Sequence, residues 1–150
     1  MCNPLLLMTL VLILLSACQK DEKVPESPTS TAIIPPRVLV LTPEQYAHGG
    51  GTLIEQVIEA AGGVNAAHDL NDFAQIADFQ ILELNPDIIL FSSTWTQDQI
   101  DTWVAADVYA PISAIQNNRY YLLDFSLADN SLTENFDTRV ATLHELFTTP

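Results

Sequence analysis

Two short apolar runs, RVLVL at 37–41 and DIILF at 87–91, constrain the fold of this chain most strongly. A strand with one face in water alternates apolar and polar residues, whereas these runs are almost entirely apolar. They therefore predict strands that are covered on both faces, as in a parallel sheet between two layers of helices. RYYLLD at 119–124 predicts a further strand, and VNAA at 64–67 predicts a short one.

Helical patterns fill the segments between these runs. Thr52 and Glu55 match a capping box, apolar residues then recur on one face, and Gly62 and Gly63 follow as a stop. Further helices are predicted at 78–85, 98–106 and 136–147. The alternation of strands and helices predicts an α/β fold: a small Rossmann-like lobe of three layers, with a short parallel sheet flanked by helices.

The amino-terminal segment differs in composition from the rest of the chain. PLLLMTLVLILLSAC is apolar but shorter than the roughly 20 residues that a membrane-spanning helix needs. Its end, LSAC, resembles the lipobox of bacterial lipoproteins, in which cleavage leaves the cysteine as an acylated first residue. We therefore predict a lipoprotein signal peptide at 1–17, although no Lys or Arg precedes the apolar run. Cys18 would then anchor the protein to a bacterial membrane, in the periplasm or at the cell surface.

The composition of the rest of the chain distinguishes a tether from a folded lobe, and its charge excludes one class of partner. Residues 18–36 are rich in Pro, Ser, Thr and charge, which is typical of a disordered, flexible tether. The single folded lobe is accordingly predicted at 37–150. The chain has 5 Lys and Arg against 19 Asp and Glu, a formal net charge of −14. Such an acidic chain repels phosphate backbones, which excludes nucleic acid as a partner.

The sequence HGGGT at 48–52 lies between a predicted strand and a predicted helix. An oxyanion hole of the lipase type needs a G-x-S-x-G nucleophile elbow, which the chain lacks. A Walker A loop needs a Lys after its last glycine, and a dinucleotide site needs G-x-G-x-x-G; neither is present. Weak binding of an anion at the helix start stays open. We expect the glycines to let the backbone turn closely beside a bound ligand.

Histidine and cysteine, the side chains that most often support catalysis or hold a transition metal, are few. His48, His68 and His144 are far apart in sequence and lack the spacing of a metal site, so we interpret them as isolated surface histidines. Loss of Cys2 with the signal peptide and acylation of Cys18 would leave no free thiol. We therefore predict no enzyme activity, no catalytic residue, no metal site and no cofactor.

Three segments in order, GGGTLIEQVIEAAGGVNAA, LELNPDIILFS and ISAIQNNRYYLLD, resemble a known family. They are similar to the carboxyl-terminal lobe of the substrate-binding proteins of ABC importers for cobalamin, haem and ferric siderophores. The resemblance extends over 37–150 and implies a periplasmic-binding-protein lobe that captures ligand at the carboxyl ends of its strands. Members of that family clamp the ligand between two lobes joined by a long helix. The amino-terminal lobe and that helix have no counterpart in the sequence given.

The resemblance also implies roles for particular residues. In this family the loops after the strands face the cleft, which assigns ligand contacts to Tyr46, His48, Gly50, Trp95 and Phe125. Flat aromatic side chains suit macrocycles such as corrin or haem. For Trp95, packing in the core stays open as the alternative.

Partners follow from the same resemblance. The stretch ENFDTR resembles the segment of cobalamin-binding members that carries an acid for docking to an ABC permease, which assigns that role to Glu134; an ordinary solvated glutamate is the alternative. The folded part has only three cations, all arginines, so a cobalamin-like ligand is favoured over the more anionic haem or ferric siderophore. Two other functions stay open. One is an interaction module that pairs with a second lobe or as a homodimer, and the other is a truncated remnant that binds no ligand alone.

Lipid attachment provides the first test. In a bacterial host grown with labelled palmitate, the full chain should incorporate label and Cys18→Ser should abolish it, because acylation at the lipobox needs the thiol. Cys2→Ser is the matched control, since this cysteine would leave with the signal peptide. Label that persists in Cys18→Ser contradicts an anchor at this residue.

Overall fold

The computed structural model describes residues 34–127 and 129–149. The predicted signal peptide, the anchor at Cys18 and most of the predicted tether lie outside the described residues. Among the residues described, no helix combines the length and the apolar character needed to cross a membrane.

The sheet is built around the two apolar runs, which form β1 (Arg37–Leu41) and β5 (Ile88–Phe91). They pair in parallel, from Val38 opposite Ile88 to Leu41 opposite Phe91. Every residue in this register is buried, because helices cover both faces of the pair. The sequence-based prediction of two fully covered strands is confirmed.

Four shorter strands complete the sheet, in the order β4–β2–β1–β5–β6 with β3 also paired to β1. They are β2 (Tyr46–His48), β3 (Val64–Asn65), β4 (Phe73–Gln75) and β6 (Tyr120–Leu122). β3, β5 and β6 pair in parallel, whereas β2 pairs antiparallel with both β1 and β4. The sheet is therefore mixed. We call the antiparallel pair of β2 and β4 the β2–β4 ribbon; three residues per strand are too few to show an alternating pattern in the sequence.

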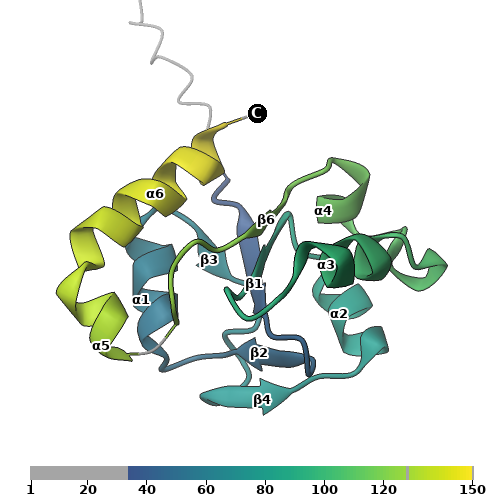
Figure 1. The fold of residues 1–150 in the computed structure, drawn as a ribbon, viewed down its shortest axis with the longest axis horizontal. Helices are drawn as coiled ribbons and strands as arrows, with labels where there is room; N and C mark the ends of the chain where they lie inside the picture. The colour runs from purple at the N-terminus through teal and green to yellow at the C-terminus, as the bar shows by residue number, and fades with distance from the viewer. Residues whose placement is uncertain (1–33, 128, 150) are drawn as a thin grey trace, which may run out of the picture. The chain divides into compact units, whose positions relative to one another are not determined.

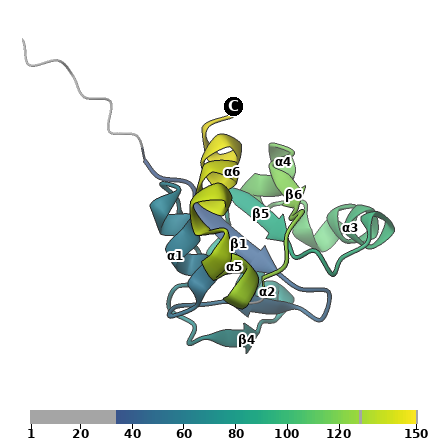
Figure 2. The same ribbon diagram turned by 60° about the vertical axis from the view of Figure 1, so that its left-hand side comes forward.

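Helices form a layer on each face of the sheet (Figure 1). One layer consists of α1 (Leu53–Ala60), α5 (Asp129–Glu134) and α6 (Phe136–Thr148). The other consists of α2 (Asp78–Leu84), α3 (Gln97–Val104), the short 3₁₀ helix η1 (Asp107–Tyr109) and α4 (Ser113–Gln116). The turned view in Figure 2 separates the layers, with α1 and α6 on one side and α3 and α4 on the other.

The core follows the alternation of side chains along the strands. Val38 and Val40 point into the cluster under α1 and α6, whereas Leu39 and Leu41 point into the cluster under α2 and α3. The predicted three-layer α/β lobe is thus confirmed, with the antiparallel ribbon as an addition at one edge.

A hydrogen-bonded group ties that ribbon to the second helical layer. Gln45, in the turn before β2, has a backbone φ of 58° and donates from Nε2 to Asp78 Oδ1 and to the Tyr109 hydroxyl. The Tyr109 hydroxyl donates to Asp78 Oδ1 at 2.7 Å. Burial, together with the adjacent Asp78 carboxylate, raises the pKa of Tyr109 to about 12. The hydrogen bonds from Tyr109 and Gln45 lower the pKa of Asp78.

This group predicts a dependence of stability on pH. The pKa of Tyr109 is about 12 in the folded protein against an ordinary value of 10.0, so its contribution is complete below pH 10.0 and is lost as the pH rises through about 12. Tyr109→Phe should lower the free energy of unfolding at pH 7 by about 2 kcal/mol, because the hydrogen bond to the Asp78 carboxylate is lost and Gln45 Nε2 loses one of its acceptors. It should also weaken the loss of stability between pH 10 and 12. Urea unfolding across this range measures both effects.

Tyr120→Phe is the control, since Tyr120 packs against the same core cluster. Stability curves of wild type and Tyr109→Phe that run parallel up to pH 12 would contradict the prediction.

Candidate ligand-binding site

A cleft of about 630 Å³ opens on the α1–α5 side of the sheet. The turn before α1 contributes one wall through Gly51 and Thr52, the β2–β4 ribbon contributes His48 and Phe73, and Asp72 lies directly before β4. The remaining lining residues are Leu53, Ile54 and Gln56 from α1, and Leu127, Leu132 and Thr133 from the segment that leads through α5. The cleft therefore lies where the first parallel strand has ended, the position at which α/β sheets bind ligands.

Two of the three glycines serve a close contact between backbones. Gly49 N donates to Asp72 O at 2.6 Å, and Gly50 N donates to Leu70 O at 2.7 Å. A methyl carbon added at Gly49 would lie 2.1 Å from Leu70 O, and one added at Gly50 would lie 2.4 Å from His68 O. Only glycine permits this approach. The expected close turn is present, but Gly49 and Gly50 turn against the loop before β4.

Gly51 differs from its two neighbours. It has a backbone φ of +85°, a conformation that favours glycine, and it lines the cleft. Gly50, the glycine predicted to contact ligand, is not among the lining residues. Its contact with ligand stays a prediction.

Three aromatic rings gather on the outer face of the β2–β4 ribbon. Tyr46 and Phe73 are stacked with ring centroids 4.7 Å apart, and His48 meets Phe73 edge-on at 4.8 Å. The register places His48 directly opposite Phe73, while Ala47 between the two β2 side chains is buried. Phe73 is 48% exposed, so its ring is available for stacking. Tyr46 and His48, both predicted from the sequence, are brought together here with Phe73, which the sequence reasoning missed.

Trp95 and Phe125 lie in the core. Trp95 is 7% exposed, donates from Nε1 to Leu41 O at 3.0 Å, and belongs to the cluster on the α2–α3 face of the sheet. It also lines a separate hollow of about 440 Å³ with Trp103. Phe125 is 3% exposed beneath the guanidinium of Arg139, which lies 4.3 Å from the ring centroid. These positions favour packing roles for both rings, and their ligand contacts stay predictions.

Glu134 ends α5 and is exposed. An exposed carboxylate at this position is compatible with docking to a partner and equally with a solvated side chain. The predicted permease contact stays a prediction.

A polar cluster behind the glycine turn fixes its position. Glu55 is 7% exposed; its Oε2 accepts from Gly51 N at 2.7 Å and its Oε1 lies 2.7 Å from His68 Nδ1. Asn65 Nδ2 donates to His48 O at 3.0 Å. The capping box predicted from Thr52 and Glu55 is wrong, because Thr52 Oγ1 donates instead to Gly49 O and makes no hydrogen bond to the helix. Thr52 and Glu55 both hydrogen-bond to the backbone of the glycine turn instead.

The charges of this cluster are coupled. Burial of the Glu55 carboxylate opposes its ionisation, but the hydrogen bonds from His68, Gly51 and Asn65 together hold the pKa of Glu55 below its ordinary value. The hydrogen bond to Glu55 raises the pKa of the His68 imidazole. In the cleft itself, neither Lys nor Arg is among the lining residues, and Asp72 supplies a carboxylate. The cleft therefore suits a bulky ligand of low negative charge better than a polyanion.

Comparison with known proteins places this lobe in a family. The model of the periplasmic binding protein family matches residues 21–127, which include the glycine turn, the ribbon and the central strands. The chain belongs to the periplasmic binding protein family, and the resemblance found in the sequence is confirmed at this level.

Individual relatives agree with the assignment. A protein named cobalamin-binding protein from Halobacterium salinarum is 32% identical over 99 residues, which cover 64% of this chain and 26% of the relative. Among solved structures, the molybdate-bound periplasmic protein MolA of Haemophilus influenzae has a TM-score of 0.66 at 21% identity, covering 73% of this chain and 34% of that one. The haem-binding protein RhuT of Roseiflexus sp. RS-1 has a TM-score of 0.65 at 23% identity, covering 77% and 46%. The two structures establish the fold, and the chain spans about a quarter of the length of the cobalamin-binding relative.

The backbone contact at Gly50 generates a prediction. Gly50→Ala should lower the free energy of unfolding by about 1–3 kcal/mol, because the added methyl group overlaps His68 O and forces the two loops apart. Gly62→Ala is the control: nothing lies within 4 Å of its added carbon, so only the strain of its φ of +89° remains, about 1 kcal/mol. Urea unfolding compares the variants. A Gly50→Ala protein as stable as wild type would contradict the close contact.

Proposed function

We propose that this lobe forms one wall of a binding site for a cobalamin-like ligand that an ABC importer takes up. The observation that carries the proposal is the stack of the half-buried Tyr46 on the exposed Phe73, with His48 edge-on to Phe73, beside the 630 Å³ cleft. A flat macrocycle gains contact area from such rings at little cost in conformational entropy, because aromatic side chains have few rotatable bonds.

The ligand class follows from charge as well as shape. A haem with two propionates or an anionic siderophore would gain from basic side chains, whereas the lining of the cleft offers none. Corrinoids carry less negative charge. The identity of 32% with a cobalamin-binding protein supports the same choice. This role includes no catalytic step and requires no resident cofactor.

The cleft is open on one side, so the lobe is expected to work with a second wall. Ligand sites generally cover most of a small molecule's surface, whereas a single wall leaves one side of the ligand uncovered. Apolar side chains at the cleft, among them Leu127 and the half-exposed Phe73, would be covered when a second lobe closes over the ligand. We propose that this second lobe comes from the same polypeptide or from a separate one. An interaction module that pairs without ligand is the second candidate function, favoured by the same apolar rim.

The remaining parts of the proposal concern the membrane anchor and the transfer of ligand to the permease. Cys18 would hold the protein at a bacterial membrane, facing the periplasm or the exterior, and Glu134 would meet the permease. Glu134 is not among the residues that line the cleft, so ligand capture can be tested without it.

The ligand site generates the central prediction. Titration calorimetry of the full chain in detergent micelles, with Cys18→Ser to prevent acylation, should detect cyanocobalamin more strongly than haemin or a ferric siderophore. Phe73→Ala should weaken binding by about tenfold, because it removes a ring that stacks on the ligand. Phe79→Ala is the matched control, since Phe79 is 61% exposed on α2, outside the cleft lining.

The pattern of results separates the two candidate functions. Equal loss in Phe73→Ala and Phe79→Ala would contradict an aromatic contact at the ribbon. Absence of heat with all three ligands would contradict capture by this lobe alone. Sedimentation equilibrium would then show whether the lobe associates with itself, as the interaction module requires.

A further inference from the structure

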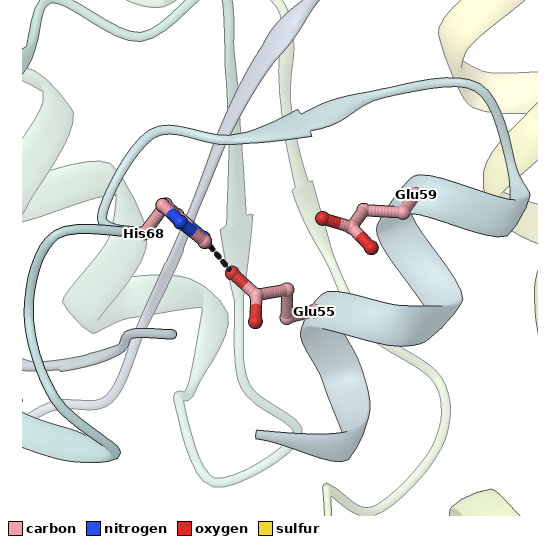
Figure 3. Close-up of side chains that lie close together, drawn as sticks. All are labelled: Glu55, Glu59 and His68. Carbon is pink, nitrogen blue, oxygen red and sulfur yellow. Dashed lines mark hydrogen bonds and ion pairs between the residues drawn. The ribbon is translucent and has the colours of Figure 1, made fainter. Parts of the chain in front are cut away.

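Three side chains with metal-binding atoms converge on the side of α1 that faces the loop between β3 and β4. Glu55 and Glu59 lie one helical turn apart on α1, and His68 reaches them from the loop (Figure 3). One ligand atom from each residue lies within 4.8 Å of the other two. None of the three residues lines the cleft.

The spacing is suited to a single ion. A tetrahedral zinc ion holds its nitrogen and oxygen ligands at about 2.0–2.2 Å, which places neighbouring ligand atoms roughly 3.4 Å apart. Glu59 is exposed, and the His68 side chain is 66% exposed, so both can make the small movement that closes the cluster. The His68 Nδ1 to Glu55 Oε1 distance of 2.7 Å would lengthen slightly as an ion replaces the shared proton.

Two of the three residues, Glu55 and His68, are held by contacts with the glycine turn. Glu55 is held by the hydrogen bond from Gly51 N, and His68 O lies in close contact with Gly50. Asn65 Oδ1 accepts from Ala67 N at 3.0 Å, which shapes the start of the loop that carries His68. A metal at this place would find one buried ligand already in position and two that adjust, so little ordering remains to oppose binding.

The charge around the cluster favours a cation. Two carboxylates belong to it, and Asp69 follows His68 directly. Two of the three arginines of the described residues are engaged elsewhere: Arg119 donates to carbonyls at the end of α6, and Arg139 lies over Phe125. One imidazole with two carboxylates is a ligand set for zinc and related divalent transition metals, whereas Mg²⁺ prefers oxygen ligands and retains its water.

Contrary to the sequence-based prediction of isolated histidines and no metal site, we propose that Glu55, Glu59 and His68 bind a divalent transition-metal ion of the zinc class, with a fourth position open to water. The ion would hold the loop between β3 and β4 against α1. This loop leads to Phe73. Through the contact between Glu55 and Gly51 it also braces the wall of the cleft. The site does not depend on the proposed cobalamin-like ligand.

Zinc titration of the full chain tests this site, with Cys2→Ser and Cys18→Ser introduced so that no thiol competes for the metal. Calorimetry should give one zinc ion per chain and weaker binding of Mg²⁺, and zinc should raise the midpoint of thermal unfolding. Glu59→Gln is the decisive variant, because it keeps the shape of an exposed side chain and removes a ligand charge. It should lower the zinc affinity by at least about tenfold, as should His68→Ala. His144→Ala, which changes a histidine on α6, should leave zinc binding unchanged.

Circular dichroism of each variant without metal verifies that the lobe is folded. Absence of zinc binding in the parent protein would overturn the proposal. Zinc binding that survives both Glu59→Gln and His68→Ala would overturn it as well, since the ion would then occupy another part of this acidic chain. Equal affinities for zinc and Mg²⁺ would also count against an imidazole ligand.

Discussion

The parallel pairing of β1 with β5 is the constraint on which the rest of this lobe depends. Both strands are buried on both faces, so helices must cover each face. Successive side chains along a strand point alternately into the two core clusters. A single four-residue register therefore joins the two helical layers into one unit. It also determines where the chain leaves the sheet. The glycine turn and the start of α1, which follow β1 and β2 in the chain, line the cleft together.

The second determinant is the contact between two loops. The glycine turn and the loop before β4 exchange backbone hydrogen bonds, and Glu55 and Asn65 support the turn from behind. This contact sets the position of β4 relative to α1. The stacked rings of the ribbon consequently lie next to the cleft, although Tyr46 and Phe73 are separated by a helix and a strand in the sequence.

The sequence predicts those parts of this structure whose physical cause is local or periodic. The apolar runs at 37–41 and 87–91 specify their strands, because a run without polar residues is stable only when both faces are covered. The sequence does not predict the strands of the β2–β4 ribbon, because each has only three residues and is stabilised by pairing with residues distant in the chain. The prediction that Thr52 caps α1 is wrong for a related reason. Its hydroxyl donates to Gly49 O, a contact that depends on the conformation of the glycine turn, and therefore does not cap the helix. The convergence of His68 with Glu55 and Glu59 has no sequence pattern, since the bend of the loop between β3 and β4 creates it.

The ribbon lies at the edge of the sheet, outside the paired β1 and β5. The outward-facing rings of β2 and β4 contribute little to either core cluster, and neither Tyr46 nor Phe73 is a member of one. Substitutions at these positions can therefore accumulate at little cost to folding, provided that the glycine turn is kept. A lobe built in this way separates the residues that maintain its architecture from the residues that we propose contact the ligand. Related proteins can thus diverge in the molecules they recognise while they retain the same scaffold.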